Sequence, residues 1–191
     1  MSTISVEQFL EELRQTATVA CLNHEIWWVY KHQETRAKYI GAMNRFNPHF
    51  HTALHAHFVA TIVALYRLYE TRNDTYNVPR LMAALDTELG QDPAAMSAAK
   101  DLYQTEIKPL WIKVSILRNN AFGHRSTEMS VEQAFQQANV TPDQLAELIQ
   151  KTKELLNNLS YGWNRSRHAF NVHAREATIR MLECLLNRDE S

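Results

Sequence analysis

Apolar residues recur every three or four positions along most of the chain, which is the spacing of amphipathic α-helices. A short connection and a polar residue with capping chemistry separate most of these stretches. The pattern predicts helices over residues 5–43 with one break, 48–70, 78–89, 92–117, 130–138, 141–159 and 174–186.

Local residues indicate where several of these helices begin and end. The spacing of a capping box occurs at three pairs, Ser5 with Gln8, Ser130 with Gln133, and Thr141 with Gln144. Pro109 is expected to bend or break the helix over 92–117, because proline lacks a backbone N–H and crowds the preceding turn. Whether the helix over 141–159 continues across Gly162 stays open.

The composition agrees with a helical protein. Only four glycines and five prolines occur in 191 residues, which disfavours a β-fold with many turns. No repeat or linker divides the chain. We therefore predict an all-α fold, an elaborated helical bundle of about seven to eight helices that forms one domain over residues 1–191.

Charge and cysteine content narrow the function classes. The formal net charge of −1 supplies no global positive field, so a polyanion would have to bind at a local patch. Cys21 and Cys184 form no spaced pair, which favours a reduced intracellular protein. No secretory signal and no apolar run of about 18 residues is present, so we expect a cytoplasmic protein without a membrane partner.

The segment LRNNAFGHRS, residues 117–126, carries the clearest chemistry. Arg118 holds a permanent charge that can grip a phosphodiester, Asn119 is polar, and His124 can transfer protons near neutral pH. On one continuous α-helix, Arg118 and His124 would lie about 120° apart. Either the helix breaks between them, as Gly123 permits, or the site uses more than one chain. The alternative is that these cations only offset the dipole at a helix C-terminus.

This segment resembles the signature of the HEPN superfamily, in which an arginine, a polar residue and, a few positions later, a histidine recur. LRNNAFGHRS is similar to the corresponding stretch of abortive-infection AbiU-type HEPN proteins. The upstream segment HTALHAHFVATIVALYRLYETRNDTYNVPRLMAAL, residues 51–85, is similar to their second helix and the short helix that follows it. The resemblance covers roughly residues 48–156.

The resemblance implies a metal-independent ribonuclease with no cofactor, active in antiphage defence or as a toxin. RNA, a second copy of the chain, and an antitoxin or other regulatory protein are the implied partners. Two facing copies of the motif would build one site, in which Arg118 stabilises the phosphate, Asn119 orients it and His124 handles the proton. The family's usual acid after the histidine is replaced by Arg125 and Ser126, which makes the site more positive. Other HEPN proteins have lost activity, so the alternative is a non-catalytic module that binds a partner protein or nucleotide.

The most basic stretch lies later in the chain, around Arg165 and Arg167. Together with Arg125, these two arginines are candidate RNA-binding residues, and Tyr161 and Trp163 beside them could stack on bases. The alternative interpretation of residues 164–168 is a solvated connection.

Four histidines crowd the segment 49–57, namely His49, His51, His55 and His57. The spacing of His51 and His55 can chelate a metal on one helix face, which makes a histidine-based metal protein a third hypothesis. No acid or cysteine lies nearby in the sequence to complete the ligand set. Partly buried or hydrogen-bonded histidines are the alternative, as is a histidine that lines an RNA groove.

Overall fold

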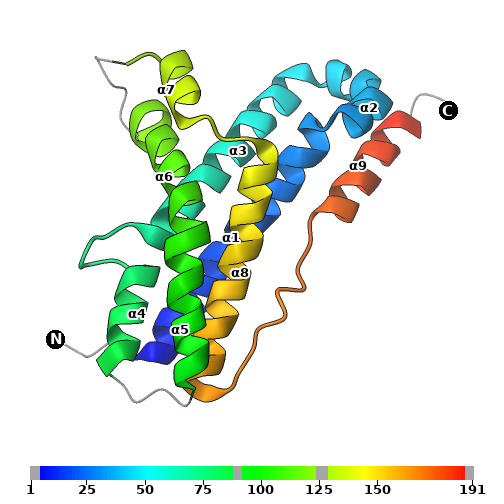
Figure 1. The fold of residues 1–191 in the computed structure, drawn as a ribbon. Coiled ribbons are helices and arrows are strands. Elements are labelled where there is room, and N and C mark those ends of the chain that lie inside the picture. The colour runs from blue at the N-terminus through cyan, green and yellow to red at the C-terminus, as the bar shows by residue number, and fades with distance from the viewer. Residues whose placement is uncertain (1–4, 88–91, 124–128, 188–191) are drawn as a thin grey trace.

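A computed structural model describes residues 5–87, 92–123 and 129–187 of the chain (Figure 1). These residues form helices without a β-strand, which confirms the all-α prediction. The elements are α1 (Val6–Lys31), α2 (Gln33–Arg45), α3 (Asn47–Tyr69), α4 (Val78–Thr87), α5 (Pro93–Leu102), η1 (Tyr103–Ile107), α6 (Lys108–Leu117), η2 (Arg118–Gly123), α7 (Val131–Ala138), α8 (Pro142–Asn164) and α9 (Arg175–Asn187). The segments α5, η1, α6 and η2 follow one another directly and form one long helix.

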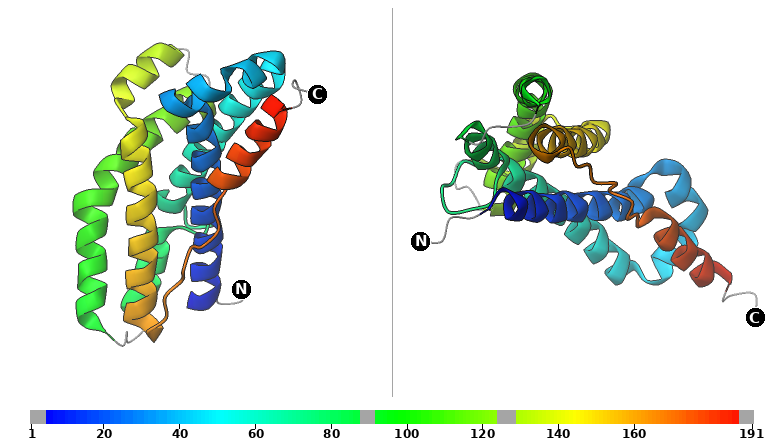
Figure 2. Two further views of the ribbon diagram at one scale, coloured as in Figure 1. Left: turned by 90° about the vertical axis from the view of Figure 1, so that its right-hand side faces the viewer. Right: turned by 90° about the horizontal axis from the view of Figure 1, so that it is seen from below.

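Four long helices build the centre of the molecule. Figures 1 and 2 show α1 and the α5–α6 helix running in one direction and α3 and α8 running in the other. Contacts join α1 to α3 and α8, and join α6 to α3 and α8. The short helix α7 packs on α6 and η2 at one end of the bundle, while α4 contacts α1 and α3 near the other.

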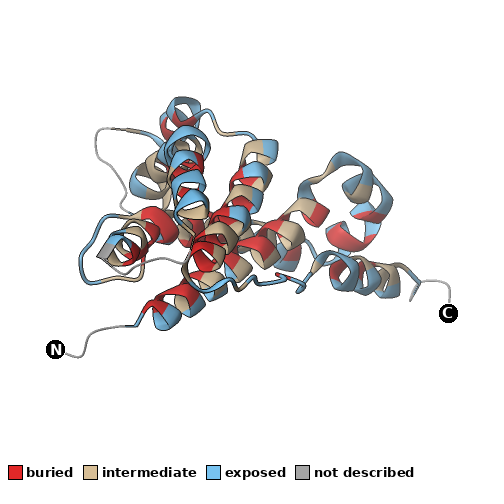
Figure 3. Cartoon of the chain, turned by 60° about the horizontal axis from the view of Figure 1, so that its bottom comes forward, coloured by how far each residue is buried: buried red, intermediate tan, exposed pale blue. Residues whose placement is uncertain are grey.

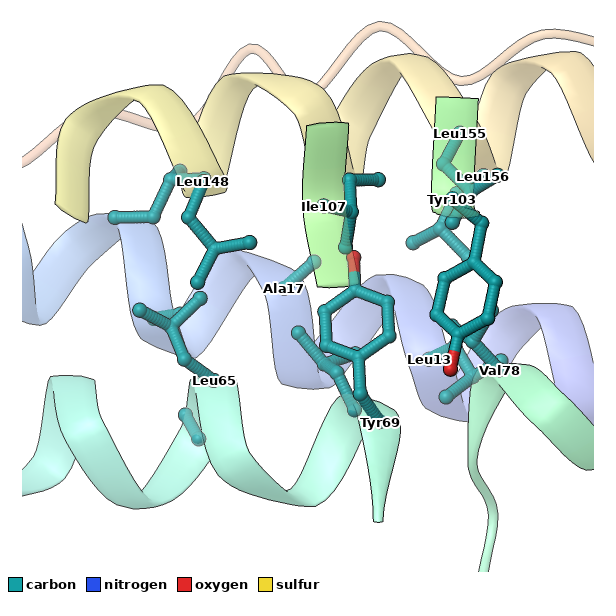
Figure 4. Packing of buried hydrophobic residues seen from close by; sticks show 14 of the residues in the cluster. Leu13, Ala17, Leu65, Tyr69, Val78, Tyr103, Ile107, Leu148, Leu155 and Leu156 are labelled. Carbon is teal, nitrogen blue, oxygen red and sulfur yellow. The ribbon is translucent and has the colours of Figure 1, made fainter. Parts of the chain in front are cut away.

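The buried core lies between these four helices, as the burial colours in Figure 3 show. Leu13, Leu65, Ile107 and Leu148 are almost completely inaccessible, and Figure 4 shows them in the space between these helices. The buried Tyr69 hydroxyl pairs with the Thr152 hydroxyl at 2.7 Å, and Thr152 in turn donates to the Leu148 carbonyl at 2.7 Å. The polar atoms that α3 and α8 bury here are therefore hydrogen-bonded, as buried polar groups must be.

A second buried cluster joins α2 and α9 to the opposite half of α1 and α3. Its members are Val29, Tyr30, Tyr39, Met43, Phe50 and Leu182. Among the described helices, none combines the length and apolar character that crossing a bilayer requires.

The capping chemistry predicted from the sequence forms at the expected positions. Ser130 and Thr141 each complete a reciprocal capping box, at the starts of α7 and α8. Ser5 caps α1 through the backbone N–H of Gln8, but the Gln8 side chain donates to the Tyr76 hydroxyl instead of returning to the cap. Side-chain capping therefore begins these helices as the local sequence predicts.

The chain does not leave the helix before Pro109, so a break is absent there, although the α5–α6 helix changes direction along its length in Figure 2. The turn η1 widens to a π-helix, with the Lys108 N–H bonding to the Tyr103 carbonyl five residues earlier. This spacing lets the helix continue past a residue that cannot donate to the normal ladder of backbone hydrogen bonds.

The helix α8 continues across Gly162, where an added Cβ would lie 2.8 Å from the Met96 sulfur. Glycine therefore leaves room for the Met96 side chain of α5 against α8.

Helix α9 is attached to the bundle through Glu25 of α1. The Glu25 carboxylate accepts hydrogen bonds from the backbone N–H groups of Ala174 (2.6 Å) and Arg175 (3.2 Å), and lies 3.0 Å from the His173 ring nitrogen. Burial raises the pKa of Glu25, but the His173 side chain and the two backbone donors outweigh it and lower the pKa below its ordinary value. A side chain from α1 therefore performs the capping role for α9.

Glu25→Ala is expected to destabilise the docking of α9 by about 1 kcal/mol, as the loss of an N-cap does. Because the folded-state pKa is depressed, this stabilisation is present above about pH 4.3 and is lost as the pH falls through the folded-state pKa. The protection factors of the α9 amides, which correct for the intrinsic exchange rate at each pH, should therefore fall in the variant at pH 7, and in the unmodified protein only in acid.

The matched control is Glu11→Gln, at an exposed position on α1 distant from α9. Equal protection of α9 amides in the Glu25→Ala protein and in this control would show that the carboxylate does not cap the helix.

Candidate functional site

The turn η2 places the first residues of the motif at the end of the long α5–α6 helix. Residues Arg118–Gly123 continue α6 without a break and adopt a π-helical turn. Between Arg118 and Gly123 the helix therefore does not break but widens. Such π-turns are frequent at functional sites, since they change which side chains share a face.

The Arg118 side chain is half-buried and held from two sides. Its guanidinium carbon lies 4.4 Å from the centre of the Tyr66 ring on α3, and one of its nitrogens donates to the Asn119 side-chain oxygen at 3.0 Å. No ion pair joins Arg118 to an acid in residues 5–87, 92–123 or 129–187. The positive charge is therefore oriented by a ring and an amide, and is not neutralised by a described carboxylate.

Gly123 allows Arg118 to occupy this position. A Cβ added at Gly123 would lie 2.7 Å from the Arg118 carbonyl oxygen and 3.1 Å from its guanidinium carbon. The first of these contacts is with backbone and cannot be relieved by a side-chain rotation. The widened turn and the arginine that it presents therefore depend on the absence of a side chain at Gly123.

Aromatic residues anchor the same turn. Phe122 contacts Phe58 of α3 at a ring-centre distance of 5.8 Å, Phe135 of α7 at 6.0 Å, and His55 of α3 at 6.2 Å. These edge-to-face contacts are the favoured geometry for aromatic pairs. Phe122 therefore fixes η2 against two other helices, a role that we did not predict from the sequence.

Tyr66 is itself held in place by Trp111 of α6. The two rings are stacked with centres 6.2 Å apart, and the Trp111 indole N–H donates to the Tyr66 carbonyl at 3.3 Å. The ring beneath Arg118 thus belongs to a connected set of contacts between α3 and α6. The only sequence signal for Tyr66 is an aromatic residue at helical spacing, which is the same signal that a core residue gives.

The two neighbouring asparagines of the motif differ in their contacts. Asn119 is exposed and accepts a hydrogen bond from Arg118, whereas the Asn120 side chain donates to the Ile116 carbonyl at 3.0 Å within the helix. His124 and Arg125 lie outside the described residues, so their assigned roles stay predictions.

The candidate RNA-binding residues Arg165 and Arg167 lie at the opposite end of the bundle from Arg118. Arg165 follows the last residue of α8, whose 23 residues span about 35 Å, and η2 lies near the first residues of that helix (Figure 1). Arg165 bonds to Asp92 at 2.6 Å, and both arginines lie over the Tyr161 ring. Within one chain, the structure therefore does not bring these arginines to the motif.

The four histidines have different surroundings. His57 lies 2.8 Å from the Asn23 side-chain oxygen, whereas His49, His51 and His55 are exposed. In the described part of the chain, no group of three or more His, Cys, Asp or Glu side chains is placed to hold a metal ion. The structure therefore adds no further ligand to the His51 and His55 pair.

Comparison with models of known protein families places the chain in a family. The family model HEPN_AbiU2, described as AbiU2, matches residues 4–180 of the chain. No curated protein and no solved structure matches it.

Proposed function

Because the chain belongs to the AbiU2 family of HEPN proteins, we propose that it is a metal-independent endoribonuclease that uses Arg118, Asn119 and His124. The observation that supports this function best is the state of Arg118. Its guanidinium is oriented by Tyr66 and Asn119 and has no carboxylate partner among the described residues. A charge held in this way is suited to bind the phosphoryl oxygens of RNA.

The proposed reaction needs no group beyond protein side chains. The 2′-oxygen of RNA attacks the adjacent phosphorus, its proton passes to a base, and the bond to the 5′-oxygen breaks as an acid protonates that oxygen. The products are a 2′,3′-cyclic phosphate and a 5′-hydroxyl. His124 supplies the proton transfer and Arg118 stabilises the negative charge that grows on the phosphoryl oxygens.

A second copy of the chain would complete the chemistry. One imidazole cannot accept the 2′ proton and donate to the leaving oxygen at the same moment, and the motif contains a single histidine. A two-fold symmetric dimer with the motifs face to face would place two histidines and two arginines around one linkage. The cellular setting that we propose is antiphage defence or toxin activity.

The purified protein is expected to cleave single-stranded RNA equally well with and without excess EDTA, because no step requires a metal ion. The fragments should end in 2′,3′-cyclic phosphate and 5′-hydroxyl groups, which mass spectrometry of the products identifies.

Loss of cleavage in EDTA, with recovery on addition of a divalent cation, would contradict the mechanism. RNA that is bound but never cut would favour a non-catalytic HEPN module.

A further inference from the structure

A pocket of about 310 Å³ lies between α1, α3 and α7, directly beside the turn η2. Its volume falls in the range of small-ligand sites. The wall from α3 presents His51, His55 and Phe58, α7 contributes Phe135, and Lys31 at the end of α1 lines the rim. The pocket therefore combines aromatic surface with groups that can donate hydrogen bonds.

The pocket and the motif share a wall. Phe122 of η2 contacts His55, Phe58 and Phe135, which are three of the residues that line the pocket. A ligand in the pocket would therefore lie against the residues that hold Phe122, which is in the same turn as Arg118. This contact with the turn η2 distinguishes the pocket as a candidate for binding part of the RNA substrate.

The aromatic surface of the pocket is open to solvent. Phe135 is 40% exposed although it stacks nearly parallel to Phe58, with an angle of 18° between the rings and 6.0 Å between their centres. His51 and His55 beside them are exposed as well. Planar rings left open in this way suit a planar ligand, because a nucleobase gains stacking energy on any such face.

The charge around the pocket favours an anionic ligand. An adjoining hollow of about 170 Å³ shares Lys31 and His51 with the pocket and adds Arg36 of α2. Among the residues that the structure describes, no aspartate or glutamate lines either hollow. Lys31 and Arg36 form no ion pair with a described residue. One cation, Lys31, therefore lines the aromatic pocket, and a second, Arg36, lines the hollow that adjoins it.

We propose that this pocket binds one nucleobase of single-stranded RNA, with the adjoining phosphates on Lys31 and Arg36. A base in a duplex is stacked and paired, so only an unpaired base can enter. The proposal deepens the ribonuclease function and rests on it, since a base held here would set which linkage of the strand reaches Arg118.

The test measures binding apart from cleavage, in the full-length His124→Ala protein. The probes are a fluorescein-labelled octauridylate and an abasic ribose-phosphate oligomer of the same length. We expect the octauridylate to bind about tenfold more tightly than the abasic oligomer, and Phe135→Ala to abolish that preference. Phe46→Ala is the matched control, because Phe46 is 42% exposed and does not line the pocket.

A second pair of variants tests the charges. Lys31→Gln should weaken the binding of both oligomers and lower the slope of log affinity against log salt by about one, because one phosphate contact is lost. Lys108→Gln, on α6, should leave the slope unchanged.

Exposed His55 provides a variant that does not risk the packing of α7, and His55→Ala should also reduce the preference for the base-containing oligomer. The proposal that the pocket binds a nucleobase is overturned by either of two results. One is that the folded Phe135→Ala and His55→Ala proteins both keep the full preference for the octauridylate. The other is that the two oligomers bind equally well. If the wild type cleaves RNA although either of these results is found, only the pocket proposal fails and the proposed ribonuclease function is retained. A preference lost in Phe135→Ala, without any cleavage by the wild type, would support the pocket and contradict the ribonuclease.

Discussion

Arg118→Ala is expected to reduce RNA cleavage by about two to three orders of magnitude, which is the usual cost of removing one group that stabilises transition-state charge. The structure indicates that the loss will be confined to catalysis. Arg118 contacts a ring and a neighbouring amide, and no described carboxylate would be left unpaired by its removal. Loss of the ring contact should cost only about 1 kcal/mol of stability. Initial rates on a labelled RNA and thermal unfolding measure the two effects separately.

Arg118→Lys refines the test, because lysine keeps the charge but lacks the planar fork that holds two oxygens. Its rate should fall between those of the wild type and the alanine variant. Arg180→Ala, at an exposed arginine on α9, is the matched control and should cleave normally. An Arg118→Ala protein that cleaves RNA at the wild-type rate would remove this arginine from the mechanism.

The starts of the helices were predictable because their chemistry is local. Ser130 and Thr141 each meet a partner three residues away, so the capping geometry is contained in a four-residue window. The helix-breaking tendency of Pro109 is also a local signal, yet the helix continues past this residue. The π-turn η1 and the packing of Tyr103 and Ile107 into the core outweigh the local tendency to break. Competition between a local signal and tertiary packing cannot be resolved from the local sequence alone.

The candidate site likewise contains some residues that the local sequence identifies and others that it does not. Arg118 and Asn119 could be chosen because adjacent residues with distinctive chemistry form a recognisable motif. Tyr66 and Phe58, which hold the motif from α3, lie more than 50 positions earlier in the sequence. An aromatic residue at helical spacing looks the same whether it faces a core leucine or a guanidinium. The sequence therefore indicates the reacting groups but not the aromatic residues that orient them.

The separation of Arg118 and His124 along the chain leads to the second large prediction. The helix widens at η2 and continues to Gly123, so no chain reversal between the two residues is seen up to that point. A site shared by two chains satisfies the chemistry without such a reversal. Mixed dimers of Arg118→Ala and His124→Ala subunits would then carry one intact arginine and one intact histidine around a single linkage.

We expect these mixed dimers to cleave RNA about tenfold or more faster than either variant alone, because each chain restores the group that the other lacks. The two variants would be mixed under conditions in which subunits exchange, and native mass spectrometry would show that mixed dimers have formed. A mixture of wild type with the Arg118→Ala, His124→Ala double variant provides the control for subunit exchange.

The outcome separates two geometries. If Arg118 and His124 of the same chain act together, neither chain of a mixed dimer holds an intact pair, and the rate stays at the level of the parent variants. If the motifs act across the two-fold axis, the rate rises, although one imidazole must then serve a reaction that the wild type performs with two. Activity restored only in part is therefore the expected result for the shared site, and a catalytically active monomer would contradict it.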